Sequence, residues 1–417
     1  MKSIFNKYLA LPAIAFTCLS LTSCEEDYEP PYKITEDSFQ IFQATGTLPV
    51  AAKYAAGETV KLELVYNKSD VKEIVLLQKF DNQDSSVVRT LPAQGAFSKI
   101  KRADTLVVEY VVPAGLANKA TVRLDAKAIG FNNASKTRSA SFRIAEATPT
   151  IKIKSVAHRS AVTAGANTAN DVIRYELVLN EGGVTSATAT TSASAILFKD
   201  LDSLNVYATV GTNPETRIDR IGLTKSGAAL TRNVDVKVPA NAVGQDVVFR
   251  FEAKAVSPKN AASVSSAPVS IVAATPFTGT ATATIGINGD AAATSFNFVG
   301  RANVGTETAT TNKDITVTSV GSNKFAVKAE NKTAFVKTTA AVYNSATVNS
   351  VRQAYYTASA ATPSQVVTSI ADLVVGDVYI AKLVDTNNYV IFKVTGINRA
   401  GADNQTTATL EYKYLQP

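Results

Sequence analysis

The chain has 417 residues, with 42 Lys or Arg, 35 Asp or Glu and a single His, which gives a formal net charge of +7. The basic residues stand singly along the sequence and form no run interleaved with aromatic residues, so the composition argues against nucleic acid as a partner. One histidine cannot supply both a catalytic triad and a metal site, so we predict a protein that is not an enzyme and has no cofactor.

Residues 1–23 are predicted to form a secretory signal peptide. Lys2 and Lys7 give it a basic start, and an apolar segment of roughly a dozen residues follows, up to Leu21. This segment is too short to cross a bilayer, which requires about 20 apolar residues. We therefore expect the segment to be removed, with cleavage just before Cys24.

The residues Leu-Thr-Ser-Cys that end at Cys24 resemble a bacterial lipobox. The resemblance implies that the chain is cut after Ser23 and that a lipid is attached to Cys24. The alternative is an ordinary signal peptide with a chance cysteine. Cys18 lies inside the signal peptide and would be lost with it, so the mature chain would have no free thiol and no disulfide.

An acidic tether is expected over residues 24–36, where Pro30 and Pro31 favour an extended spacer. Three acidic residues directly after the cysteine resemble the export signal of surface lipoproteins of the Bacteroidetes: Glu25, Glu26 and Asp27. The resemblance implies a protein held on the outer membrane by its lipid and facing the cell exterior. The alternative is an ordinary solvated tether.

Two long segments of the chain repeat each other. Residues 123–149 align without a gap with residues 250–276, and both segments end in Ala-Thr-Pro. Upstream, residues 61–67 resemble 174–180, and residues 71–79 resemble 218–225. The sequence separation between matching positions of the two copies therefore rises from 113 to 147 residues. We interpret this pattern as two tandem domains, 37–147 and 148–275, the second with an insertion near residues 181–214.

Each copy reads as a series of short alternating strands separated by turn signals, which predicts an immunoglobulin-like β-sandwich. The Cys–Trp–Cys core of antibody domains is missing, so the two copies resemble bacterial Ig-like modules. Pro149 and Pro276 close the two copies, and we expect stiff joints there because proline restricts the backbone.

Residues 276–417 are predicted to form a third, β-rich domain. Residues 280–298 suggest a hairpin that turns at Asn288-Gly289. A second hairpin is expected to turn at 385–388, and residues 408–414 suggest a final strand. Residues 367–381 are the one place where we expect a short helix or tight turn.

Residues 295–319 and 379–414 resemble the HmuY-like haem-carrier lipoproteins. Haem capture needs axial ligands, usually His or Met. The third domain has neither, and the sole histidine, His158, belongs to the second copy. Tyr355 or Tyr356 would be the remaining candidate ligand, although adjacent tyrosines are more often packing residues in strands or loops.

Glycosidases use paired carboxylates, and two pairs of neighbouring acidic residues are candidates for such a pair. We interpret both pairs as turn residues whose carboxylates bond the local backbone: Asp81 with Asp84, and Asp200 with Asp202. Ig-like domains ahead of a distinct C-terminal module resemble the layout of starch-binding surface lipoproteins. The absence of Trp argues against a sugar-stacking platform, although 15 Tyr remain.

The sequence therefore predicts an all-β, lipid-anchored surface protein that acts in binding, adhesion or scaffolding, without catalysis. Its expected partners are the outer membrane, through the lipid, and an extracellular glycan or protein. The alternative is an accessory nutrient-binding lipoprotein for glycan or haem.

Overall fold

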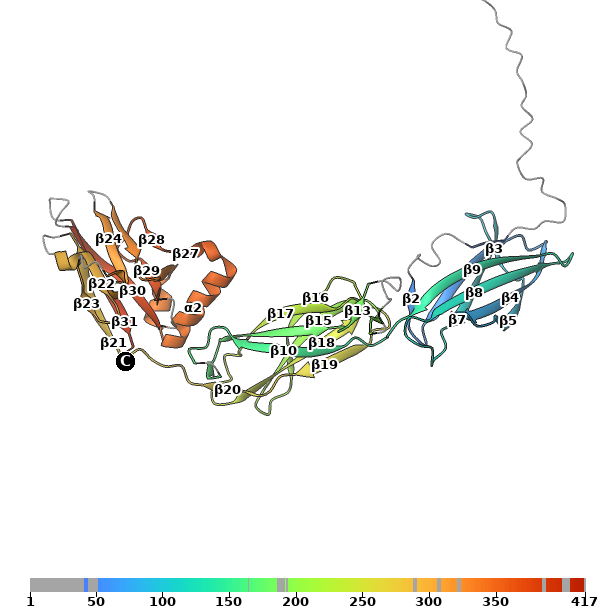
Figure 1. The fold of residues 1–417 in the computed structure, drawn as a ribbon, viewed down its shortest axis with the longest axis horizontal. Coiled ribbons are helices and arrows are strands. Elements are labelled where there is room, and N and C mark those ends of the chain that lie inside the picture. The colour runs from blue at the N-terminus through green and yellow to red at the C-terminus, as the bar shows by residue number, and fades with distance from the viewer. Residues whose placement is uncertain are drawn as a thin grey trace, which may run out of the picture.

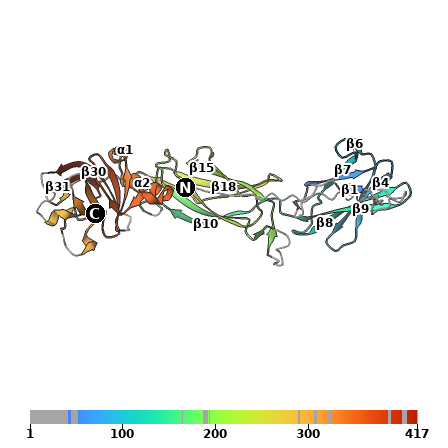
Figure 2. The ribbon, with the colours of Figure 1, turned by 90° about the horizontal axis from the view of Figure 1, so that it is seen from above.

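The computed structural model describes residues 41–43, 52–163, 165–185, 192, 194–287, 291–305, 309–320, 324–384, 388–399 and 406–415. The expected signal peptide and tether lie outside these residues, and so do Cys24, Glu25, Glu26 and Asp27. Three β-domains follow one another along the chain and lie in a row (Figures 1 and 2). The predicted all-β fold class is confirmed.

The first domain is a sandwich of two sheets with one apolar core. Its strands alternate between buried and solvent-facing side chains, as in β8, where Val122, Leu124 and Ala126 point inward. The four-stranded sheet has the order β1 (Ile41–Gln43), β3 (Thr59–Tyr66), β7 (Ala103–Val111), β6 (Ala96–Ser98). The five-stranded sheet has the order β2 (Lys53–Tyr54), β9 (Ser135–Ile144), β8 (Thr121–Gly130), β4 (Val71–Phe80), β5 (Ser86–Pro92).

The second domain repeats this topology. One sheet has the order β10 (Ile151–His158), β12 (Val172–Leu179), β17 (Leu230–Lys237). The other has the order β11 (Asn167–Thr168), β20 (Val269–Val272), β18 (Asp246–Ala255), β15 (Leu201–Val210), β16 (Thr216–Gly222), and β19 (Ala261–Ser265) also pairs with β18. The ring of Tyr175 packs on Phe251 and Phe249 at centroid distances of 4.9 and 5.9 Å, so aromatic packing fills a core that lacks a disulfide.

The strand pairings correct one part of the predicted repeat. In the first domain β4 pairs with β8 and β5, and in the second β15 pairs with β18 and β16. The counterpart of residues 71–79 is therefore β15, not residues 218–225. The predicted insertion at 181–214 was wrong at its C-terminal end, because it would have included this core strand. Alternating β-branched residues look alike in neighbouring strands, which explains the misalignment.

The extra chain of the second domain lies between β12 and β15. It contains a parallel pair of short strands, β13 (Gly183–Val184) and β14 (Ile196–Leu197). This segment has a structural role, because its last residues contact the first domain.

The joint between the first two domains is built by residues 196–200. Leu197 and Lys199 form backbone hydrogen bonds with Glu146, and the Leu197 N–H donates to Asn118 Oδ1 at 2.9 Å. Lys199 Nζ lies 2.8 Å from Glu58 Oε2, and both side chains are nearly buried. Lys53 pairs with Asp200 at 2.6 Å. Hydrogen bonds and ion pairs between the two domains thus hold this joint, in addition to the restriction of the backbone expected from Pro149.

The third domain has three layers: two sheets and a helical layer. The six-stranded sheet has the order β21 (Gly279–Gly286), β31 (Thr406–Tyr414), β30 (Asn388–Arg399), β29 (Val378–Leu383), β26 (Ala334–Thr338), β27 (Val366–Val367). The five-stranded sheet has the order β23 (Ala302–Asn303), β22 (Ser295–Asn297), β24 (Ile315–Val320), β25 (Phe325–Ala329), β28 (Ser369–Ile370). The helical layer is α1 (Ala340–Asn344) and α2 (Val348–Ala361), and short 3₁₀ turns are η2 (Ala291–Thr294), η3 (Thr310–Asn312) and η4 (Pro363–Gln365).

The two sheets enclose the main apolar core, and α2 covers the other face of the six-stranded sheet. A short helix or tight turn was expected within residues 367–381, and a tight turn lies there: residues 375–376 form a turn just before β29, in which the Asp377 N–H donates to the Val374 carbonyl at 3.0 Å. Helix α2 itself was not predicted. The helix lies upstream because residues 348–361 are rich in alanine and begin with a capping box, in which Thr347 and Ser350 exchange hydrogen bonds.

Of the two hairpins predicted in this domain, one is confirmed. Strands β29 and β30 pair directly, with Leu383 opposite Asn388, and β31 supplies the expected final strand. The predicted hairpin over residues 280–298 was wrong, because β21 pairs with β31 while β22 pairs with β23 and β24. The chain crosses between sheets at this point, and a local turn signal does not distinguish a crossing from a hairpin.

Helix α2 also forms the joint between the second and third domains. Gln353 Nε2 donates to Asp171 Oδ1 at 3.0 Å and to the Ala169 carbonyl at 3.1 Å. The Tyr356 hydroxyl donates to Asp235 Oδ2 at 3.3 Å. Asp171 is fully buried and also accepts from Ser160 Oγ at 2.7 Å, so the joint surrounds a buried carboxylate with donors.

Candidate binding site

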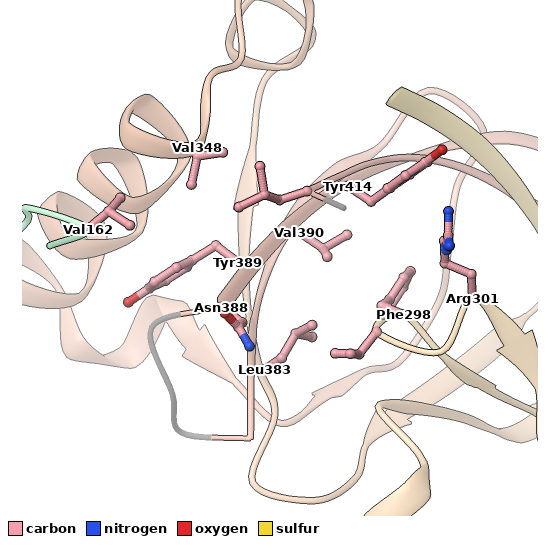
Figure 3. Close-up of a pocket in the computed structure, with 11 residues that line it drawn as sticks. Val162, Phe298, Arg301, Val348, Leu383, Asn388, Tyr389, Val390 and Tyr414 are labelled. Carbon is pink, nitrogen blue, oxygen red and sulfur yellow. The ribbon is translucent and has the colours of Figure 1, made fainter. Parts of the chain in front are cut away.

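A cavity of about 160 Å³ lies in the third domain, beside the start of α2 (Figure 3). Its floor is apolar and buried, from Phe298, Leu383 and Val390. Val348 of α2 lines one end together with Val162 of the second domain. The site is therefore completed at a domain joint, which is a common location for ligand pockets.

Two tyrosines stand on different sides of this cavity, Tyr389 and Tyr414 (Figure 3). The Arg301 guanidinium lies over the ring of Tyr414, 4.8 Å from the ring centroid. The ring of Tyr389 packs edge-on against Tyr355 at 5.4 Å, and the Arg352 guanidinium lies 5.9 Å away. Cation–π contacts of this kind hold the rings and the guanidinium groups in place.

The turn that carries Arg301 is fixed by hydrogen bonds. The Phe298 N–H donates to Asp314 Oδ2 at 2.7 Å, and the Gly300 N–H donates to Asn297 Oδ1 at 2.6 Å. Arg301 has a φ of 53°, a left-handed conformation that costs energy in a residue other than glycine. The surrounding turn therefore holds Arg301 at the rim of the cavity.

Asp314 is the buried acid behind this turn, and its side chain has almost no contact with solvent. Burial raises the pKa of Asp314, while the hydrogen bonds from Phe298 and Thr333 partly oppose the rise. Its carboxyl group supports the turn from inside the domain and does not line the cavity.

Among the residues that the structure describes, the lining of the cavity includes one cation and no carboxylate. An apolar floor, two phenol rings and a guanidinium suit a ring-shaped group that carries an acceptor or a negative charge. Pockets for whole small molecules usually have volumes of about 300–1,000 Å³. A smaller cavity fits one ring or one side chain of a larger partner.

A second cavity, of about 340 Å³, lies at the joint between the first two domains. Its charged groups are paired with one another, Lys53 with Asp200 and Lys199 with Glu58. We assign these residues to the joint and not to ligand binding.

The tyrosines proposed as haem ligands lie on α2, not in a strand or loop. Tyr355 is buried against Tyr389, and the Tyr356 hydroxyl contacts Asp235 of the second domain. His158, at the end of β10, is hydrogen-bonded through Nδ1 to Asn167 Oδ1 at 3.0 Å. These three residues have structural partners and do not converge on the cavity.

The acidic pairs do not lie at the cavity either, and Asp81, Asp200 and Asp202 have structural partners. Asp81 accepts the Thr121 N–H at 2.7 Å beside the β4–β5 turn. Asp200 pairs with Lys53, and Asp202 lies 3.3 Å from Arg220. The interpretation of Asp200 and Asp202 as turn residues bonded to local backbone was therefore wrong, because both form ion pairs.

The residues of the cavity were not identified from the sequence. Tyr389 and Tyr414 are 25 positions apart and Arg301 lies far upstream, and only strand pairing brings them together. Among the described residues, no group of three or more His, Cys, Asp or Glu side chains is arranged to hold a metal ion. No helix in the described part of the chain is long and apolar enough to cross a membrane.

The chain matches no family model and no curated protein. Among solved structures it is similar to a marsupial T cell receptor, with 10% sequence identity, a TM-score of 0.19, and coverage of 55% of this chain and 100% of that chain. The assignment of the two sandwiches rests on the strand pairings above.

Proposed function

We propose that the protein is a lipid-anchored, non-enzymatic binding or adhesion protein of the bacterial surface. In this proposal the lipid on Cys24 holds it on the outer membrane, facing outward. The first two domains act as a spacer, and the third domain binds an extracellular partner.

The observation that carries this proposal is the end-to-end arrangement of the three domains. The chain enters the first domain at β1, and the cavity lies in the domain at the other end of the row (Figure 1). Buried polar contacts hold both joints, through Lys199 with Glu58 and through Gln353 with Asp171. A stiff series of domains suits the display of a binding site away from the membrane.

The size and lining of the cavity favour one ring or side chain of a glycan or protein over a whole haem. A haem carrier would also need an axial ligand, and the nearby Tyr355 is occupied by packing. This supports adhesion over the HmuY-like haem-binding alternative.

The test uses the soluble full-length Cys24→Ser chain, applied to a glycan array and to immobilised extracellular proteins. Tyr389→Ala and Tyr414→Ala should each weaken binding about tenfold, since each removes a stacking ring of about 1 kcal/mol or more. The matched control is Tyr207→Ala, another tyrosine under an arginine, Arg250 at 4.0 Å, but on the second domain. Equal binding by all three variants would refute the site, and a Soret shift with haem would favour the haem carrier.

A further inference from the structure

The end of the first domain that faces away from the second domain has an unusual surface. Three turns meet there: residues 67–70, 99–102 and 131–134. The strand register places them together, because Tyr66 pairs with Asp104, Val71 pairs with Gly130, and the Phe131 N–H contacts the Asp70 carbonyl at 3.4 Å. We call this surface the free end.

Large apolar side chains are exposed at the free end. Ile100 is 96% exposed, Phe131 is 68% exposed, and Phe97, in the strand beside the 99–102 turn, is 65% exposed. Ile100 is the most exposed large apolar residue among those the structure describes. Exposed aromatic and aliphatic side chains that lie together mark an interaction surface more often than scattered ones do.

The same turns are basic. They contain Lys68, Lys99, Lys101 and Arg102, against the single acid Asp70. Lys101 is paired with Glu63, while Lys99 and Arg102 are exposed beside Ile100. Apolar side chains surrounded by Lys and Arg suit a surface with a hydrocarbon interior and anionic headgroups.

The second domain shows that these features are not required by the fold. Its equivalent end contacts the first domain through residues 196–200 and through Ser257, which donates to Glu58 at 2.9 Å. Its described residues between β16 and β17 form no counterpart of β6, and its β18–β19 turn, residues 256–260, contains no aromatic residue. The exposed apolar residues therefore belong to the first of the two copies and are not a property of the shared fold.

The path of the chain brings the free end near the anchor. Strand β1 enters at this end, since Ile41 pairs with Tyr66. Between Cys24 and Ile41 the chain is 17 residues long, which reaches at most about 60 Å when fully extended. A lipid on Cys24 therefore keeps this end within reach of the membrane.

We propose that the free end rests on the lipid surface, with Ile100, Phe97 and Phe131 in the interfacial layer and Lys99 and Arg102 against lipid phosphates. This inference rests on the proposed lipid anchor at Cys24. The contact would set the orientation of the three domains relative to the membrane plane.

The first experiment uses the lipidated full chain reconstituted into phosphatidylglycerol-containing vesicles. Ile100→Cys and, as a control, Val375→Cys in the third domain, which is 55% exposed, are labelled with an environment-sensitive fluorophore. We expect quenching by lipid-attached nitroxide at position 100 and not at position 375. Equal and weak quenching at both positions would overturn the proposal, whereas failure of the protein to float with the vesicles would count against the Cys24 anchor instead.

The second experiment measures co-sedimentation of the unlipidated Cys24→Ser chain with the same vesicles. Each basic residue near an anionic surface raises the partition coefficient onto the vesicles about fivefold. The double variant Lys99→Ser, Arg102→Ser should therefore lower this coefficient on the order of 25-fold. Lys225→Ser with Lys332→Ser, at exposed positions in the other domains, should leave it unchanged. Equal losses in both double variants, or no loss in either, would contradict the assigned surface.

Discussion

Replacing Lys199 with Met tests whether the inserted segment locks the first two domains together. Lys199 Nζ has three partners in the first domain: Glu58 Oε2 at 2.8 Å, the Lys53 carbonyl at 2.8 Å and the Tyr54 ring at 5.3 Å. The Lys199 and Glu58 side chains are only 12% and 13% exposed. Methionine keeps most of the apolar stem but leaves the Glu58 carboxylate without its counter-charge.

Removing one partner of a buried ion pair costs about 3–5 kcal/mol. Glu58 keeps the hydrogen bonds from the Ala55 N–H and the Ser257 hydroxyl, so we expect the lower value, about 3 kcal/mol. In a domain of this size each kcal/mol lowers the melting temperature by about 4–8 °C. The transition of the first domain should therefore fall by roughly 12–24 °C and separate from that of the second.

The assay is differential scanning calorimetry of the Cys24→Ser chain with and without Lys199→Met. Lys61→Met is the matched control, because Lys61 pairs with Glu109 at 3.1 Å while the two side chains are 64% and 56% exposed. An exposed pair contributes about 0–1 kcal/mol. If Lys199→Met shifted the transition no more than Lys61→Met, the joint would not be held by this ion pair.

Three further predictions concern single side chains. Asp314→Asn should leave the free energy of unfolding at pH 7 equal or higher. The raised pKa of Asp314 means that its ionisation costs stability as the pH rises. In urea titrations the unfolding free energies of the Asn variant and of the chain with Asp314 should converge below about pH 4. Burial opposes ionisation of Glu252, but hydrogen bonds from Asn205, Lys254 and Arg250 hold its pKa down at about 2. Glu252→Gln should therefore lower stability at neutral pH, and this difference should vanish as acid titrations approach pH 2. Thr347→Ala removes the N-cap of α2 and should cost about 1 kcal/mol in the third domain's thermal transition, while Ser345→Ala, just outside that cap, should cost less.

The β-character of the three domains follows from the sequence because alternating Val, Thr and Ile residues form strands regardless of distant contacts. Helix α2 was missed even though local signals were present. Thr347 and Ser350 form a capping box, and Val348, Val351 and Tyr355 are spaced along one helical face. The adjacent Tyr355 and Tyr356 are of a residue type that favours strands, whereas the alanine residues around them favour a helix.

The joints and the cavity could not be found in this way. Residues 196–200 look like an ordinary loop, and their role depends on Glu58 and Glu146 of another domain. The cavity likewise combines the turn at Arg301 with β30 and β31 and with Val162 of the second domain. Such contacts are long-range consequences of strand register, which single-sequence patterns do not encode.

The measurement that tests the account most directly is the distance between the two outer domains in solution. Spin labels at Val88→Cys in the first domain and Val375→Cys in the third, both at exposed positions, would be placed in the Cys24→Ser chain. Stiff joints predict one narrow distance distribution, which Lys199→Met should broaden. A broad distribution in the chain that retains Lys199 would contradict a stiff series of domains and, with it, the proposed display of the third domain.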